Sequence, residues 1–412
     1  MEMEDVVVGL DIGTTKTCAV IGFVNENNQV EVVGVGVAPS TGLKNGIVVN
    51  IDNTVSSIVS AVEKAEFMAG CEVSVVYVGM SGQHVKGENS KGVVAVSNRN
   101  RTITQLEVKR VIEAAQAIVI PVDRQIMHVL STEFAVDDQY GIKDPIGMSG
   151  VRLEADVHII TGANTSIQNL VKSVNGSGFE CTDIIFSPLA SAEATLNQDE
   201  RELGVVLVDI GGGTTDIMLY FEGGVAFSSV LAVGGIHVTN DISIGLRTPL
   251  ESAEIIKKKN GCSVVDIVDV SDTIEVPSVG GRAPRRLFKQ ELAQIIEPRM
   301  MEIMEMVDHE LLKSGKKDVL AAGVVLTGGG SMIDGCIEAA ERIFNMPVRI
   351  GISEDIAGLK DKVATPIFSN GVGLLKYGIK MNRFMRTKSK YGKEGRITSF
   401  RKIIRRLYED YL

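Results

Sequence analysis

The same kind of glycine-rich turn occurs twice in this chain, each time directly after a short apolar run. The first copy reads Asp11-Ile12-Gly13-Thr14-Thr15-Lys16, and the second reads Asp209-Ile210-Gly211-Gly212-Gly213-Thr214-Thr215-Asp216. Glycine lets the backbone point its N–H groups inward after a buried strand, which makes a cradle for anions such as phosphate. The copies are too far apart for a solenoid repeat. They therefore indicate two related domains that face one cleft.

An aspartate ends the predicted strand before each turn, at Asp11 and at Asp209. A carboxylate repels phosphate, so these side chains predict a hydrated Mg²⁺ ion that bridges protein and phosphate oxygens. Either turn alone is typical of an ordinary hairpin. Together they predict a polyphosphate held from both sides, with its metal ion.

A third glycine-rich turn, Gly328-Gly329-Gly330-Ser331, follows another apolar run and precedes a predicted helix. A flat ring can lie against backbone that carries no side chains. Taken alone, the segment is better explained as a tight turn with a helix N-cap at Ser331. In combination, the three turns predict an adenine nucleotide.

The composition favours an α/β fold in a reducing compartment. The 412 residues contain no Trp and are 44% apolar, with abundant Val, Ile and Gly, which suits strands packed under helices in two or more domains. No apolar run is long enough to span a membrane, so neither a membrane-spanning helix nor secretion is expected. The cysteines form no CxxC pair, which argues against a zinc site or a disulfide framework; they are Cys18, Cys71, Cys181, Cys262 and Cys336.

Changes in residue pattern along the chain indicate its domain organisation. Between about 83 and 162 the sequence becomes rich in Gly, Ser and Asn, with strand-like runs around one helical segment. The predicted parts are a first domain (1–82 and 163–195), an inserted subdomain (83–162), a second domain (196–229 and 304–381), a small lobe (230–303), a flexible basic linker (382–396) and a terminal helix (397–412).

The end of the chain differs sharply in charge from the rest. The net charge is −10, yet residues 383–412 contain ten basic and three acidic side chains. An acidic body does not favour nucleic acid, whereas a basic tail suits an anionic surface.

Within the tail, apolar residues return at helical spacing with basic residues on their flanks. Three functions are open for such a helix: it docks on its own domain, it binds a partner protein as calmodulin targets do, or it lies in a membrane interface. We favour anionic lipid, bound weakly by one helix and tightly by many joined chains. The helix comprises Ile397, Phe400, Arg401, Lys402, Ile403, Ile404, Arg405, Arg406, Leu407 and Tyr411.

The three turns together resemble those of the superfamily of actin, heat-shock chaperones and sugar kinases. Two longer strings are similar to the bacterial cell-division family FtsA: Gly141-Ile142-Lys143-Asp144-Pro145-Ile146-Gly147-Met148-Ser149-Gly150-Val151-Arg152-Leu153-Glu154, and Gly234-Gly235-Ile236-His237-Val238-Thr239-Asn240-Asp241-Ile242 with Gly245-Leu246-Arg247-Thr248-Pro249. The resemblance covers essentially the whole chain.

This resemblance implies an actin-like fold of two RNase H-like domains around a nucleotide cleft, with the inserted subdomain and an amphipathic C-terminal helix. It further implies a polymer on the cytoplasmic face of the cell membrane at the division septum. That polymer would tether the tubulin-like FtsZ, through the FtsZ C-terminal tail, and contact later division proteins. The small lobe would bind the tail, for which the basic residues Arg285, Arg286 and Lys289 are candidates.

The resemblance also implies roles for individual residues. Residues Gly13, Thr14, Thr15, Lys16 and Gly211, Gly212, Gly213, Thr214, Thr215 would bind the β and γ phosphates of ATP, and Asp11 and Asp209 would orient Mg²⁺ and its waters. Glu254 and Lys257 match ribose and adenine contacts, Gly234 and Gly235 belong to the second matching string, and Gly328 to Ser331 would back the adenosine. Taken without the resemblance, Glu254 and Lys257 are an ordinary solvated ion pair on one helix face.

One position departs from the family pattern. Relatives often carry Glu or Gln before the Pro-Leu-Ala segment, where this chain has Ser187 before Pro188. A serine is too short to position an attacking water, so slow ATP turnover is expected.

Two alternative functions remain open from the sequence. A sugar or carboxylate kinase has a similar opening motif, although no residue of 83–162 stands out as the carboxylate base that such an enzyme needs. The second alternative is an actin-like protein of pilus assembly or cell-shape control.

Overall fold

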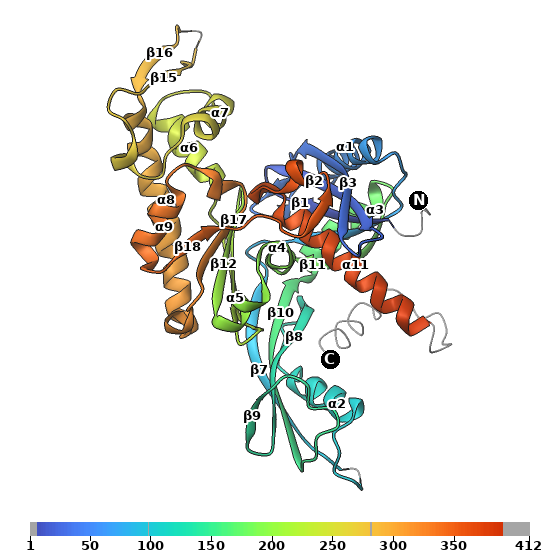
Figure 1. The fold of residues 1–412 in the computed structure, drawn as a ribbon. Helices are drawn as coiled ribbons and strands as arrows, with labels where there is room; N and C mark the ends of the chain where they lie inside the picture. The colour runs from blue at the N-terminus through green and yellow to red at the C-terminus, as the bar shows by residue number, and fades with distance from the viewer. Residues whose placement is uncertain (1–5, 98, 281, 390–412) are drawn as a thin grey trace.

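The computed structural model describes residues 6–389 except 98 and 281, so the predicted helix 397–412 and most of the predicted linker lie outside the described residues. Two α/β domains stand side by side, and a smaller subdomain extends from their junction (Figure 1).

The first domain is built on a six-stranded sheet of order β11-β6-β1-β2-β3-β19. Its strands are β1 (Val7–Ile12), β2 (Lys16–Val24), β3 (Val30–Pro39), β6 (Val75–Met80), β11 (Glu180–Phe186) and β19 (Ile356–Gly358). Helices α1 (Ile51–Ala69) and α3 (Asn164–Gly176) cover one face, while α4 (Ser187–Thr195) and α11 (Ser369–Ser389) pack together on the other. A short hairpin, β4 (Leu43–Lys44) and β5 (Ile47–Val48), precedes α1.

The second domain repeats this plan with a five-stranded sheet of order β14-β13-β12-β17-β18. Alternate residues of β12 enter different cores: Val205 and Leu207 pack with the first domain, whereas Val206 and Val208 pack under α8 and α9. The strands are β12 (Val205–Ile210), β13 (Thr215–Phe221), β14 (Gly224–Leu231), β17 (Gly323–Thr327) and β18 (Val348–Ile350); the helices are α5 (Gln198–Leu203), α8 (Lys289–Ser314) and α9 (Cys336–Phe344). The short helix α10 (Lys360–Val363) follows β19 and packs on the first domain through Val363.

The small lobe of the second domain contains α6 (Gly235–Gly245), α7 (Leu250–Asn260) and a hairpin of β15 (Thr273–Val276) and β16 (Arg285–Phe288). The inserted subdomain has its own sheet of order β7-β10-β8-β9, covered by α2 (Gln105–Ala115), with its own core. Its strands are β7 (Lys86–Ala95), β8 (Arg124–Val136), β9 (Gln139–Ile142) and β10 (Arg152–Ala163).

The structure corrects one predicted boundary. The sequence predicts a flexible linker from residue 382, but α11 continues to Ser389. The apolar periodicity does end near Met381, yet Arg, Lys and Met are good helix formers, and no Gly or Pro interrupts the helix before Gly392. Loss of periodicity marks the end of packing there, whereas the helix itself runs on.

Candidate functional site

The two glycine-rich turns have the same geometry and meet at one cavity. In each turn the first glycine donates its N–H to the carbonyl three residues on, Gly13 to Lys16 and Gly211 to Thr214, both at 2.9 Å. A Cβ atom on Gly212 would lie 2.5 Å from Thr15 Oγ1. The turns are therefore in direct contact, as the sequence predicts for two lobes that grip one ligand.

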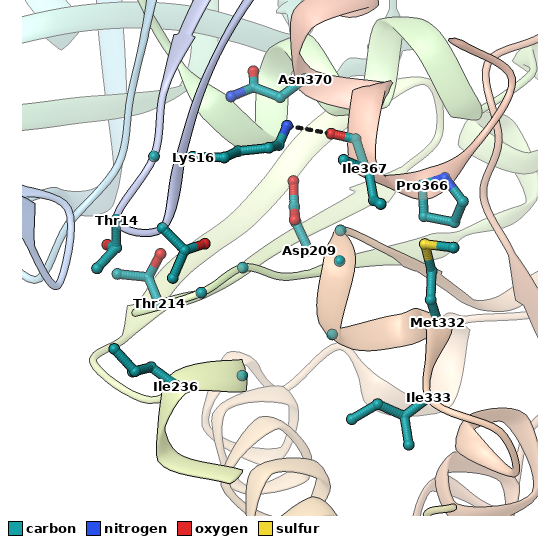
Figure 2. Close-up of a pocket in the computed structure, with 18 of the residues that line it drawn as sticks. Thr14, Lys16, Asp209, Thr214, Ile236, Met332, Ile333, Pro366, Ile367 and Asn370 are labelled. Carbon is teal, nitrogen blue, oxygen red and sulfur yellow. Dashed lines mark hydrogen bonds between the residues drawn. The ribbon is translucent and has the colours of Figure 1, made fainter. Parts of the chain in front are cut away.

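The cavity between the domains has a volume of about 460 Å³ and receives residues from all three glycine-rich turns. The predicted residues that line it are Asp11, Gly13, Thr14, Thr15, Lys16, Asp209, Gly211, Gly212, Thr214, Gly235, Glu254, Lys257, Gly328, Gly329 and Gly330. Thr14 and Thr214 lie on one side of Asp209, and Met332 and Ile333 on the other (Figure 2).

Three aspartates at the polar end of this cavity each accept a hydrogen bond from a neutral donor. Asn370 Nδ2 donates to Asp11 Oδ1 at 2.8 Å, and Ser191 Oγ donates to Asp209 Oδ2 at 2.8 Å. The third is Asp216, which pairs with Asp209 across β12 and β13 and accepts a hydrogen bond from Ser81 Oγ at 2.5 Å. The Ser81 bond joins the two domains beneath the cavity.

The negative charge of this cluster is only partly balanced. Burial raises the pKa of Asp209 to about 6 and raises the pKa of Asp216 well above its ordinary value, and the neighbouring carboxylates add to both effects. Lys16 is the cation in contact with the cluster: its Nζ lies 3.2 Å from Asp11 Oδ2. A site of this kind favours a bound cation, because a cation lets the carboxylates ionise without repelling one another.

Lys16 also contacts the far side of the cleft. Its Nζ donates to the carbonyl of Ile367 at 2.5 Å (Figure 2). Burial alone would lower the pKa of Lys16, but Asp11, Cys18 and Asp209 outweigh it, and the pKa is raised. The lysine is therefore a charged link between the first turn and the chain that leads into α11.

The other end of the cavity is apolar and contains little side-chain bulk. Its lining includes the bare backbone of Gly328 to Gly330, with Met332, Ile333 and Pro366 around it. A Cβ on Gly330 would lie 2.3 Å from Ile210 Cγ2, so this backbone packs closely on the second turn. The slot suits a flat, largely apolar ring beside a polar, metal-binding end.

Glu254 and Lys257 form a partly buried network instead of a fully solvated ion pair, with the Glu254 side chain 33% exposed. Lys257 is 8% exposed, and its Nζ lies 2.7 Å from Glu254 Oε2, 2.9 Å from the Gly235 carbonyl and 2.8 Å from Thr239 Oγ1. Burial would raise the pKa of Glu254, but Lys257 and its other partners hold it below its usual value. Since Gly235 begins α6 beside the second turn, this network ties α7 to the cavity wall.

Comparison with known proteins identifies the family. The model of cell division protein FtsA matches residues 206–373, and that of the SHS2 domain inserted in FtsA matches residues 82–161. The chain is 49% identical to a cell division protein FtsA of Pseudomonas aeruginosa over 373 residues, covering 90% of this chain and 89% of the relative. For the proteins of Escherichia coli and Borreliella burgdorferi the identities are 43% and 42%, with 90% and 96% of this chain covered and 90% and 97% of those relatives.

The chain belongs to the FtsA family. It is a cell-division protein. Membership of this family favours cell division over the kinase and pilus-assembly alternatives. Solved structures show that its fold is actin-like α/β: a PilM–PilN type IV pilus biogenesis complex aligns with a TM-score of 0.66 at 16% identity, covering 90% of this chain and 98% of that one. MreB5 of Spiroplasma citri bound to AMPPNP aligns with a TM-score of 0.56 at 14% identity, covering 95% and 100%.

Four residues predicted for the site of this FtsA-family chain do not line the cavity. Thr215 points away, because side chains alternate along a strand, and its Oγ1 donates to the Val233 carbonyl at 2.8 Å. Ser331 Oγ donates to the Gly328 carbonyl at 2.8 Å. Gly213 and Gly234 pack behind the turns, the former against Thr14. These four residues support the lining from behind.

Sequence reasoning missed several residues of the site. Asp216 belongs to the second turn motif. Because side chains alternate along a strand, Asp216 is expected on the same side as Thr214, and this could have placed it in the cavity. Ser81, Ser191 and Asn370 come from chain segments far from the turns, and no motif marks them.

Among residues 6–389, excluding 98 and 281, no helix is long and apolar enough to cross a membrane.

Replacing Lys257 with methionine is expected to destabilise the protein by about 2 kcal/mol, because Glu254 and Thr239 lose a buried partner while Lys258 still neutralises Glu254. Lys258→Met is the matched control: Lys258 contacts the same carboxylate at 3.1 Å, but its side chain is 70% exposed, so a change below about 0.5 kcal/mol is expected. Urea unfolding measures both. Equal effects of the two substitutions would contradict the buried network.

Proposed function

We propose that this chain binds ATP with Mg²⁺ in the cavity between its two domains and polymerises on the inner face of the cytoplasmic membrane at the division septum. In this proposal it is a peripheral membrane protein that anchors FtsZ filaments and helps to recruit later division proteins. ATP serves chiefly to close the cleft and favour the polymer.

The observation that carries the nucleotide proposal is the junction of the three glycine-rich turns at one cavity. Backbone N–H groups of two facing turns suit a polyphosphate, and the apolar slot beside Gly328 to Gly330 suits adenine. The ribose lies between them in this arrangement, where Glu254 and Lys257 line the wall. The nucleotide-bound MreB5 with the same fold supports this assignment.

The residues of the site fit a magnesium ion bound through water. Asp11, Asp209 and Asp216 would accept hydrogen bonds from its water ligands, and the ion would supply positive charge to the phosphates and to the cluster. The described residues include no group of three or more His, Cys, Asp or Glu side chains arranged to hold a metal directly. The proposed binding is through water because Mg²⁺ usually keeps several of its waters.

The expected turnover is slow. Ser187 begins α4, is buried and lines the cavity, but a hydroxymethyl group is short and weakly basic for positioning water in line with a phosphate. The proposed role of ATP is thus to change shape and assembly, with hydrolysis at most a slow step.

Two surfaces carry the proposed partner contacts. The C-terminal segment 397–412, whose sequence predicts a basic amphipathic helix, would bind anionic lipid. The proposed contact for the FtsZ tail lies in the small lobe: Arg285 and Arg286 are exposed on β16, and Lys289 begins α8. Arg286 Nε donates to Thr273 Oγ1 at 2.7 Å, and the Arg285 guanidinium donates to the Leu246 carbonyl, so the hairpin presents these charges in a fixed position.

A reconstitution with anionic vesicles and purified FtsZ tests the proposal. The chain is expected to co-sediment with the vesicles and to bring FtsZ with it, while deletion of residues 397–412 abolishes both effects and leaves ATP binding unchanged. FtsZ without its C-terminal tail is the control and should stay in the supernatant. Vesicle binding that survives the deletion would refute the membrane part, and recruitment of tailless FtsZ would refute the tethering part.

A further inference from the structure

The end of helix α1 carries an exposed patch that the proposed nucleotide site does not use. We call it the α1 patch; it consists of Glu63, Glu66, Phe67, Met68, Cys71 and Glu72. Glu63, Glu66, Phe67, Cys71 and Glu72 surround a shallow hollow, and Met68 adjoins it in sequence.

The α1 patch combines apolar surface with unneutralised negative charge. Phe67 is 91% exposed and Met68 is 41% exposed, which is unusual for large apolar side chains next to each other. Among the described residues, none of the three glutamates takes part in a salt bridge; Glu66 accepts a hydrogen bond from the Val73 N–H at 2.6 Å. Such a surface fits an amphipathic segment that is apolar along one side and basic beside it.

Helix α11, the last described helix, contacts the same end of the strands at which this patch lies. Helix α1 leads through residues 70–74 into the start of β6, and the β2–β3 turn contains Asn28 at that end of the strands. Near the end of α11, Tyr77 Oη donates to Asn382 Oδ1 at 2.8 Å, and Arg383 donates to Asn28 Oδ1 at 2.5 Å. Helix α11 thus passes the end of the strands where the patch lies, although α1 and α11 cover opposite faces of the sheet.

The residues beyond α11 have chemistry complementary to the patch and are joined to α11 by a connecting segment. Seven residues, 390–396, separate Ser389 from Ile397. Extended, they span about 25 Å, roughly two helix diameters. After them come the apolar stripe Ile397, Phe400, Ile404 and the cations Arg401, Lys402, Arg405, Arg406.

We propose that the basic C-terminal segment 397–412 docks intramolecularly on the α1 patch, with its apolar stripe against Phe67 and Met68 and its cations beside the glutamates. The segment uses the same apolar and basic groups that lipid would bind, so docking and membrane binding exclude each other. The chain is therefore autoinhibited for membrane attachment until anionic lipid outcompetes the patch. This consequence rests on the proposed membrane role, whereas the docking itself does not.

The native Cys71 reports directly on the docked state. In the full chain without vesicles, its rate of maleimide labelling is expected to be at least about fivefold lower than in a full chain carrying Arg401→Glu, Lys402→Glu, Arg405→Glu and Arg406→Glu, because labelling requires the undocked fraction. High salt should remove most of the difference. Cys181, half-buried at the start of β11, is the internal reference and should react equally in both proteins.

Three results would overturn the proposal. Equal labelling of Cys71 in the two chains would show that the segment does not cover the patch. Protection that disappears on dilution would assign the patch to a second copy of the chain. The third result concerns vesicle binding. Phe67→Ser is expected to lower the anionic lipid concentration needed for half-maximal co-sedimentation. Val122→Ser is the control and should not change that concentration, because Val122 is fully exposed in the inserted subdomain, away from the patch. Identical lipid titrations of these two variants would refute autoinhibition, and if no variant binds vesicles the labelling still tests the docking.

Discussion

Asp209→Asn is expected to stabilise the nucleotide-free protein at neutral pH while weakening its binding of Mg²⁺–ATP. The pKa of Asp209 is about 6 in the folded protein, against 3.8 for a free carboxyl. Between these values the folded state binds more protons than the unfolded state, so the free energy of unfolding falls as pH rises. Above pH 6 the loss is complete, and it amounts to about 3 kcal/mol, since each pKa unit is worth 1.36 kcal/mol.

Thermal unfolding across pH tests this expectation. The variant should unfold several degrees above the parent at pH 7.5, and the difference should shrink toward pH 4. Calorimetric titration should show affinity for Mg²⁺–ATP reduced roughly 10- to 100-fold, with little change in affinity for ATP without metal. Ser191→Ala is a useful companion, because it removes the donor to Asp209 but leaves the charge. A parent and an Asn variant with equal affinity for Mg²⁺–ATP would contradict the proposed metal role.

Gly373→Ala is expected to cost about 3 kcal/mol of stability, although alanine favours helices over glycine by about 1 kcal/mol. Gly373 lies within α11 where that helix crosses α4. A Cβ there would lie 1.7 Å from the Ala190 carbonyl oxygen and 2.3 Å from its carbon. Backbone atoms cannot rotate away as side chains can, so the two helices must separate.

The same substitution should weaken nucleotide binding, because these two helices carry the donors to the carboxylates. Ser191 of α4 holds Asp209, and Asn370 of α11 holds Asp11. Gly371→Ala in the same helix is the matched comparison: its Cβ would meet a Val20 methyl at 2.8 Å, a longer contact and with a side chain in place of backbone, so a smaller loss of stability is expected. Denaturant unfolding and nucleotide titration compare the two variants. Similar stability of both would show that the close α4–α11 packing contributes little to stability.

The two glycine-rich turns show how far the sequence reaches. Their shared pattern predicts two related domains and a common cleft, and the structure confirms that both turns line one cavity. The pattern works because a phosphate-type turn is local: strand, glycine and polar residue must follow each other along the chain. At Thr215 the prediction and the structure differ, since the alternation of β13 turns that side chain toward Val233, whereas Asp216 lines the cavity.

The Glu254–Lys257 pair shows the opposite limit. Spacing on a helix establishes that the two side chains are neighbours, but it does not reveal whether water surrounds them. Only the packing of α7 against α6 buries Lys257 and adds Thr239 and the Gly235 carbonyl as partners. Burial depends on what lies opposite, which the local sequence does not state.

The family resemblance, the α/β class, the repeated turns and the basic tail can all be recognised from the amino-acid sequence, because composition and local motifs carry them. Which groups hold the carboxylates, and which residues turn away from the cavity, depends on how distant segments pack. The same packing places the α1 patch at the end of the strands that α11 passes. Ser81, Ser191 and Asn370 reach Asp216, Asp209 and Asp11 from distant segments. Such contacts follow from how sheets and helices pack, and packing joins residues that no local pattern connects.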